Sequence, residues 1–181
     1  DYWKPIQAGT LEATDRAFVK SMLSNSSSVV HDEVYRLKFA ASPHIAANAE
    51  GVEISIDKIL ENCPQTNNRL IIEGAGGLLA PINKSHFIFD LIKKLNAEVI
   101  IVSRNHLGSI NHSLLTAEML KQKNIPVLGW IFNDEYLDYE TEIALWSGFP
   151  WIASVRHLPV INRSVIHEQS IKLIDHIKMV L

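Results

Sequence analysis

The chain has 181 residues, of which 47% are hydrophobic, and a formal net charge of −3. This length and apolar content suffice for one domain with a sizeable core, so we predict a single domain over residues 1–181. The charges are spread along the chain without a basic stripe, which argues against a nucleic-acid partner. A lone cysteine, Cys63, and the absence of an apolar run near the roughly 20 residues of a membrane span predict a cytoplasmic protein without membrane association.

Apolar, β-branched runs alternate with segments of helical periodicity along the chain. This alternation is typical of parallel strands joined by crossover helices, so the predicted fold class is α/β, a mostly parallel sheet flanked by helices. Ser85 is a plausible N-cap, with Phe87, Leu91 and Leu95 on one buried helix face. We predict strands at residues 2–7, 69–73, 98–103, 126–132 and 151–155, and helices at residues 15–24, 54–62, 85–95, 109–123, 139–147 and 165–181.

Ligands of open α/β sheets gather beyond the carboxyl ends of the strands, so the residues after each predicted strand are candidates for a site. Lys4, held extended by Pro5, is either a point charge for a phosphate or carboxylate, or a surface lysine whose stem covers apolar surface. Asp15 opens the next predicted helix. It either compensates the helix dipole or binds Mg²⁺, which takes one or two carboxylates.

The stretch "LIIEGAGGLLAPIN" places one acid, Glu73, at the end of an apolar strand. Such an acid is costly to bury unpaired and needs water, a cation or a hydrogen-bonding loop. Gly74, Gly76 and Gly77 permit positive φ and offer backbone N–H groups to a phosphate. The spacing is not G-x-G-x-x-G, which argues against a Rossmann dinucleotide site. Glu73 is therefore either a functional acid or part of a tight turn.

The stretch "NHLGSINHSLLTAEML" follows the third predicted strand and enters a helix. The amides at such a helix start form an anion site for a carboxylate or phosphate, although a glycine-eased helix entry is an equally good interpretation. The residues concerned are Gly108, Ser109, Ile110 and Asn111.

Two further motifs have both a local and a functional interpretation. In "GWIFND", Asn133 carries a donor and an acceptor that suit a base edge, but Asn-Asp after a strand also forms turns. In "SPHIAA", Pro43 suits the first turn of a short helix.

Together, "YWKPIQAG", "SPHIAA", "EGAGGLLAPI", "LGSINHSLLTAEML" and "GWIFND" stand in the order and approximate spacing of the dethiobiotin synthetase family, which the chain resembles from residue 1 to about residue 156. The resemblance implies a P-loop NTPase-like fold. The family's P-loop motif, G-x-x-x-x-G-K-[ST], is not found in these residues, nor is the first strand and helix that carry it. Because that strand normally lies inside the sheet, we expect this sequence to be a portion of a longer polypeptide.

The resemblance implies a ligase of biotin biosynthesis that acts on 7,8-diaminononanoate, CO₂ or bicarbonate, and ATP with Mg²⁺. One amine captures CO₂ as a carbamate, the carbamate attacks the γ-phosphate, and the second amine closes the cyclic urea. Lys4 is implied to contact the carbamate and γ-phosphate, and Asp15 and Glu73 to bind Mg²⁺. The family often has a hydroxyl residue where Ala8 stands, which leaves one substrate contact in doubt.

The resemblance also implies a homodimer with the substrate site at its interface. The substrate residues would be Gly108, Ser109, Ile110, Asn111 and Pro43, and the nucleotide residues Asn133, Gly76, Gly77 and His157. The alternative hypothesis is a non-catalytic dimeric module that holds a small carboxylate at the start of the predicted helix at residues 109–123. A third hypothesis is a related amidating or partitioning ATPase, but the glutaminase or membrane-targeting segments of such proteins are not visible in this sequence.

Overall fold

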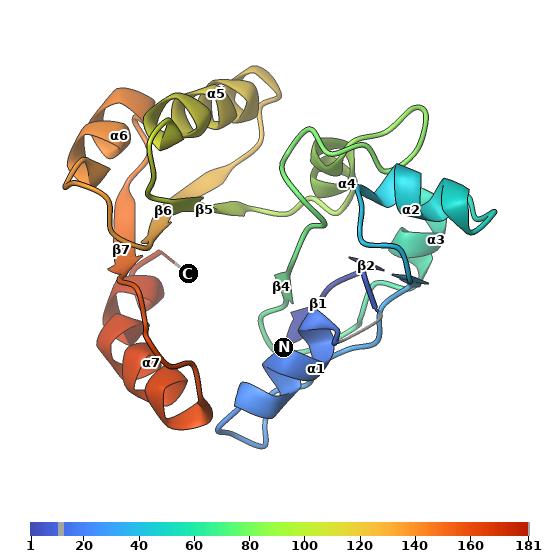
Figure 1. Cartoon of the computed structure of the whole chain (residues 1–181), viewed down its shortest axis with the longest axis horizontal. Coiled ribbons are helices and arrows are strands. Elements are labelled where there is room, and N and C mark those ends of the chain that lie inside the picture. The colour runs from blue at the N-terminus through green and yellow to red at the C-terminus, as the bar shows by residue number, and fades with distance from the viewer. Residues whose placement is uncertain (11–12, 181) are drawn as a thin grey trace. The chain divides into compact units, whose positions relative to one another are not determined.

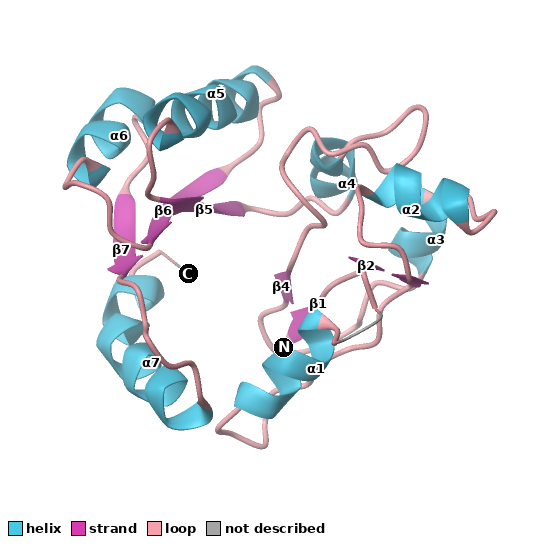
Figure 2. Ribbon diagram, viewed as in Figure 1, coloured by secondary structure: helices cyan, strands magenta, loops and turns pink. Residues whose placement is uncertain are grey.

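The computed structural model describes residues 1–10 and 13–180 and divides into two compact units, Asp1–Leu95 and Asn96–Leu181. Both units contain strands and helices, which alternate strictly along the chain in the second unit (Figure 2). Among the described strands, all pairings are parallel, which confirms the predicted α/β class with parallel strands and flanking helices. The single domain over residues 1–181 stays a prediction, and each unit is described by itself below.

The first unit contains two small parallel sheets (Figure 1). One pairs β1 (Tyr2–Trp3) with β4 (Ile71–Ile72), and the other pairs β2 (Ile6–Ala8) with β3 (Tyr35–Leu37). Its helices are α1 (Asp15–Met22), α2 (Pro43–Ala49), α3 (Ile56–Glu61) and α4 (Ile88–Lys94).

The strand predicted at residues 2–7 is in fact two strands, interrupted at Lys4 and Pro5. Pro5 has no N–H to donate to a ladder, and its carbonyl accepts the N–H groups of both Val34 and Tyr35, at 2.9 and 3.0 Å. The chain therefore changes its partner from β4 to β3 at this point. Lys4 lies at the change of partner.

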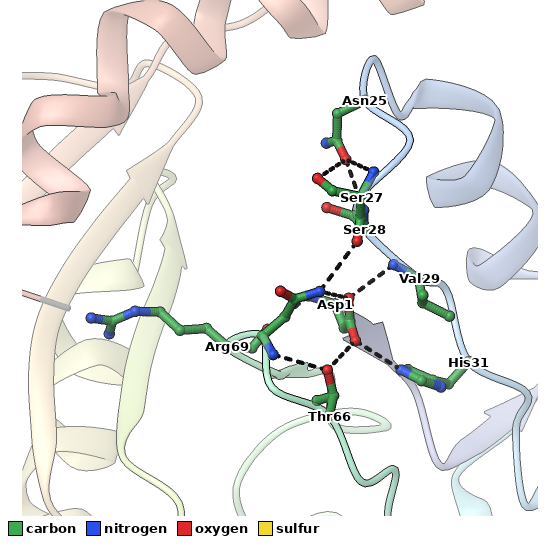
Figure 3. Close-up of polar contacts among 9 residues, drawn as sticks. Asp1, Asn25, Ser27, Ser28, Val29, His31, Thr66 and Arg69 are labelled. Carbon is green, nitrogen blue, oxygen red and sulfur yellow. Dashed lines mark hydrogen bonds and ion pairs between the residues drawn. The ribbon is translucent and has the colours of Figure 1, made fainter.

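A polar network fixes the start of β1 (Figure 3). The Asp1 carboxylate accepts hydrogen bonds from the Val29 N–H (2.9 Å), the Thr66 hydroxyl (2.6 Å) and the Asn68 amide (2.9 Å). The backbone carbonyl of Asp1 accepts the N–H of Ile71, at 2.9 Å. Two loops that are distant in sequence are thus tied to β1 and β4. The apolar core of this unit includes Trp3, Ile6, Leu37, Ile59 and Ile82.

The second unit is a three-stranded parallel sheet in the order β5-β6-β7. In it, α5 and α6 contact each other and the sheet, while α7 contacts β7 (Figure 1). Trp130 and Phe132 stack in the core with ring centroids 5.6 Å apart, and the Trp130 indole donates to the Ser147 hydroxyl at 2.9 Å. The elements are β5 (Val99–Arg104), α5 (Ser109–Gln122), β6 (Val127–Asn133), α6 (Glu140–Ser147), β7 (Trp151–Val155) and α7 (Arg163–Lys178).

The predicted cap at Ser85 is wrong. Asn83 Oδ1 accepts the N–H groups of Ser85 and His86, both at 2.9 Å, which holds this stretch in a turn and delays α4 until Ile88. Phe87 then occupies the N-cap position and is exposed, while Leu91 is buried as predicted. Leu181, the predicted end of the last helix, lies outside the described residues. Within the described residues, no helix has the length and apolar character needed to cross a bilayer.

Candidate active site

Lys4 is buried and lies between two carboxylates. Its Nζ donates to Asp15 Oδ2 at 2.5 Å and to Glu73 Oε1 at 2.7 Å. The three residues come from the link between β1 and β2, the first turn of α1, and the end of β4. The structure thus brings together the three residues that the sequence selected at strand and helix ends.

The backbone around the two acids is fixed by short-range hydrogen bonds. Thr14 is the N-cap of α1, and its hydroxyl accepts the N–H of Ala17 at 3.1 Å. The N–H of Asp15 donates to the buried side chain of Gln7 at 3.2 Å, and the N–H of Glu73 donates to the Trp3 carbonyl at 2.9 Å. Asp15 is a first-turn acid of α1, as one of its two interpretations predicted, and its carboxylate is also a partner of Lys4. Its binding of Mg²⁺ stays a prediction.

Tyr2 completes this cluster, and sequence reasoning missed it. Its hydroxyl donates to Glu73 Oε2 at 2.5 Å. Because side chains of an extended chain alternate between faces, Tyr2 and Lys4, two residues apart, were candidates for the same face. The two oxygens of Glu73 therefore have different partners.

Protonation follows from these contacts. Burial by itself lowers the pKa of Lys4, but the hydrogen bonds that Lys4 donates to Asp15 and Glu73 outweigh it, and the pKa of Lys4 is raised. The Lys4 hydrogen bond holds the pKa of Asp15 below its usual range. Burial, and then the hydrogen bond to Glu73, raise the pKa of Tyr2. At neutral pH the ammonium and the Asp15 carboxylate are charged, and Tyr2 keeps its proton.

The donor chemistry fits a magnesium ion. The side chains of Asp15 and Glu73 are 46% and 43% exposed, whereas that of Lys4 is 10% exposed, so the carboxylates also face solvent. Mg²⁺ is commonly bound through one or two carboxylates, with water and phosphate oxygens as its other ligands. Over residues 1–10 and 13–180, no group of three or more His, Cys, Asp or Glu converges into a metal site. These two carboxylates are thus suited to a partial coordination shell.

Glycines follow Glu73 on an exposed loop. Gly76 has φ +86°, and a Cβ there would lie 3.1 Å from the Ala80 Cβ. Gly77 is exposed and has nothing within 4 Å of an added Cβ. This exposed backbone is compatible with the predicted approach of a phosphate. Elsewhere in the unit, Pro43 occupies the first turn of α2, as predicted, and α2 contacts β2 and β3.

In the second unit, Gly108 is the N-cap of α5 with φ +95°. Ser109 does not face solvent: its hydroxyl lies 2.6 Å from the Tyr139 hydroxyl and its N–H donates to the His106 carbonyl at 3.0 Å. The N–H groups of Ile110 and Asn111 are in the first turn, where N–H groups have no partner within the helix. The predicted anion site at Gly108, Ser109, Ile110 and Asn111 stays a prediction, in which the Ser109 hydroxyl already has a partner within the protein.

Asn133 and His157 lie at the carboxyl edge of the second sheet. Asn133 is exposed at the end of β6, and the next residue, Asp134, donates its N–H to the Val155 carbonyl at 2.9 Å. His157 Nδ1 is 4.0 Å from Asp134 Oδ1. Sequence reasoning missed Asn105, which is buried at the same edge and donates to Glu140 Oε1 at 2.7 Å.

The parallel strands, the flanking helices and the charged residues at the strand ends place the protein in the class of α/β proteins that bind ligands at the carboxyl edge of a sheet. The comparison with known families agrees with this class. A family model described as an AAA domain matches residues 1–165, and the chain belongs to that family.

Curated relatives identify the family more closely. The chain is 46% identical over 178 residues to the ATP-dependent dethiobiotin synthetase BioD of Cytophaga hutchinsonii, covering 97% of this chain and 85% of the relative. It is 42% identical to the protein of that name from Christiangramia forsetii (95% and 82% covered) and 38% identical to that of Lawsonia intracellularis (93% and 83% covered). The chain therefore belongs to the ATP-dependent dethiobiotin synthetase family of enzymes, which confirms the predicted family.

Proposed function

We propose that the protein is a ligase of biotin biosynthesis that uses ATP and Mg²⁺ to convert 7,8-diaminononanoate and CO₂ or bicarbonate into dethiobiotin. Membership of the dethiobiotin synthetase family supports the reaction class. The observation that carries the proposal is the cluster of Lys4 with Asp15 and Glu73, because a transfer of phosphate between anions needs fixed positive charge and a metal-binding pair of acids at one place.

The chemistry has three bond-forming steps. One amine of the substrate adds to CO₂ and gives a carbamate. A carbamate oxygen attacks the γ-phosphorus of ATP, and ADP leaves, which gives a carbamic-phosphoric anhydride. The second amine attacks the anhydride carbonyl, phosphate leaves, and the cyclic urea is closed.

Lys4 supplies the local positive charge for these steps. An ammonium has three N–H donors, and the hydrogen bonds to Asp15 and Glu73 use two of them. A third donor is left for a carbamate or γ-phosphate oxygen. Because the two carboxylates keep Lys4 protonated, it acts as a donor and not as a base. Asp15 and Glu73 would hold Mg²⁺, which would offset phosphate charge.

We assign the remaining ligand contacts by the same family resemblance. Asn133 recognises adenine, with His157 in the adenine loop and Gly76 and Gly77 near the phosphates. The substrate carboxylate binds at the start of α5, across the interface of a cytoplasmic homodimer. The substrate residues are Gly108, Ser109, Ile110, Asn111 and Pro43.

Turnover by the full-length protein tests the proposal. With ATP, diaminononanoate, bicarbonate and Mg²⁺, we expect formation of dethiobiotin, measured by mass spectrometry. Glu73→Gln and Lys4→Ala should each reduce the rate by about 100-fold or more, since each removes a charge from the reacting centre. Glu61→Gln, at the exposed end of α3, is the matched control and should keep the wild-type rate.

Two outcomes would count against the proposal. Unchanged turnover in both Glu73→Gln and Lys4→Ala would refute the assignment of the site. Calorimetric binding of diaminononanoate without turnover and without dependence on nucleotide would instead favour the non-catalytic carboxylate-binding module.

A further inference from the structure

Tyr2 contacts Glu73 on the side opposite Lys4. The Tyr2 hydroxyl is 2.5 Å from Glu73 Oε2, while Lys4 Nζ is 2.7 Å from Glu73 Oε1. The carboxylate is therefore held at both oxygens by residues from one short stretch of chain. The sequence separation between Tyr2 and Glu73 is 71 residues, so the contact exists only in the folded protein.

The backbone of Tyr2 is fixed on both sides. In β1, Tyr2 is paired with Ile71 of β4, two residues before Glu73. Its N–H donates to the Val29 carbonyl and its carbonyl accepts the N–H of His31, both at 2.9 Å. The hydroxyl is consequently presented to Glu73 from a strand that is hydrogen-bonded to neighbours on two sides.

We propose that Tyr2 is a positioning residue: its hydrogen bond to Oε2 of Glu73 fixes the orientation in which the carboxylate would bind a cation. This inference rests on the proposed function, in which Glu73 is a magnesium ligand.

The chemical type of the donor matters. A carboxylate has two equivalent oxygens and can rotate, so an unfixed glutamate samples several ways of binding a cation. A phenol that donates to one oxygen selects an orientation, and hydrogen bonds to a charged acceptor are the strong kind. Unlike Lys4, Tyr2 brings no positive charge, so it orders Glu73 without repelling a metal ion. Partners of this kind, one step removed from the metal, typically change metal affinity by 10- to 100-fold when they are mutated.

Direct metal binding to the full-length protein tests the inference without reliance on activity. The probe is Mn²⁺, and the loss of its free-ion electron paramagnetic resonance signal reports binding. We expect Tyr2→Phe to weaken Mn²⁺ binding by about 10-fold. Tyr35→Phe is the matched control, because the Tyr35 hydroxyl is also hydrogen-bonded, to the Ser55 N–H at 3.0 Å, in the same unit. It should bind Mn²⁺ like the wild type.

A double-mutant cycle separates positioning from a general loss of structure. If Tyr2 acts through Glu73, adding Tyr2→Phe to Glu73→Gln should produce no further loss of Mn²⁺ affinity. An equal loss in both backgrounds, or wild-type affinity in Tyr2→Phe, overturns the inference. So does an absence of Mn²⁺ binding by the wild type.

The enzyme assay distinguishes a failure of the inference about Tyr2 from a failure of the proposed function. If Glu73→Gln and Lys4→Ala abolish turnover while Tyr2→Phe needs no more Mg²⁺ than the wild type, only the role of Tyr2 is refuted. If turnover survives in Glu73→Gln and Lys4→Ala, the proposed function itself fails.

Discussion

At the scale of single residues, Lys4 illustrates how a buried ammonium keeps its charge. Desolvation opposes the charged form, and two carboxylates within hydrogen-bonding distance compensate for it. Removing either acid leaves the ammonium with a single counter-charge. The arrangement that we assign to catalysis therefore also contributes to the stability of the first unit.

The pH dependence of stability follows from the same contacts. The pKa of Asp15 is lowered by Lys4, so its stabilising contribution is present above the unfolded pKa, about 3.9, and is lost as the pH falls through the folded pKa. The pKa of Lys4 is raised, so its contribution is present below its unfolded pKa, about 10.4, and is lost only as the pH rises through the folded pKa. Between these limits the pair contributes a constant amount.

Asp15→Asn should accordingly destabilise the protein at neutral pH but progressively less in acid. We expect a loss of about 1 kcal/mol or less at pH 7, because the Asp15 side chain is half exposed and its charge is screened. Urea unfolding of both proteins between pH 3 and pH 8 measures this. A difference in unfolding free energy that stays constant down to pH 3 would contradict the assignment of the ion pair.

At the scale of elements, β6 contains a backbone feature that only glycine can adopt. Gly129 has φ +149° next to a register shift in the pairing with β5. An added Cβ would lie 2.4 Å from the Pro150 carbonyl oxygen and 2.9 Å from Ile152 Cγ1. That carbonyl accepts the N–H of Trp130 at 2.8 Å, so it cannot move without loss of a sheet hydrogen bond.

Gly129→Ala should therefore destabilise the second unit by about 2–4 kcal/mol, through backbone strain and the clash with β7. Gly77→Ala is the control for stability, because nothing lies within 4 Å of its added Cβ. Chemical denaturation followed by circular dichroism compares the two variants. Equal stability of Gly129→Ala and wild type would show that the strand relaxes around the new methyl group.

The elements also show which parts of the fold follow from local sequence. The long apolar runs that became β5, β6 and β7 were predicted to within one residue at each end, because apolar, β-branched runs of this length are typical of strands in a parallel sheet. The short β3 (Tyr35–Leu37) was missed, since three residues with an arginine in the middle carry too little periodicity. The break at Pro5 depends on a partner strand that the local sequence does not specify.

The candidate site likewise combines features that local sequence predicts with features that depend on distant partners. Lys4, Asp15 and Glu73 were predictable because parallel strands and the helices after them bring their ends to a common edge. The hydrogen bond of Tyr2 depends on the register of β1 with β4, which a local pattern does not determine. Ser109 was assigned to a ligand, yet its hydroxyl is hydrogen-bonded to Tyr139, which lies 30 residues further along the chain.

At the scale of the whole molecule, the division of the chain into two compact units bears on whether it unfolds in one step or two. In the described part of the first unit, the named strands form two two-stranded sheets, β1 with β4 and β2 with β3. Two-stranded sheets are marginally stable alone, and domains of fewer than about 100 residues have little stability to spare. We therefore expect the stability of Asp1–Leu95 to depend on that of Asn96–Leu181, as the prediction of a single domain over residues 1–181 requires.

Gly129→Ala provides the test, because the strain and the clash that it introduces lie within the second unit. Hydrogen exchange measured by mass spectrometry on peptides reports the protection of each unit separately. If the chain unfolds as one domain, the slowest-exchanging amides around Trp3 and Ile59 in the first unit should lose the same opening free energy as those around Trp130 and Phe132 in the second. If protection falls only in residues 96–180, the units unfold independently and the prediction of a single domain is wrong.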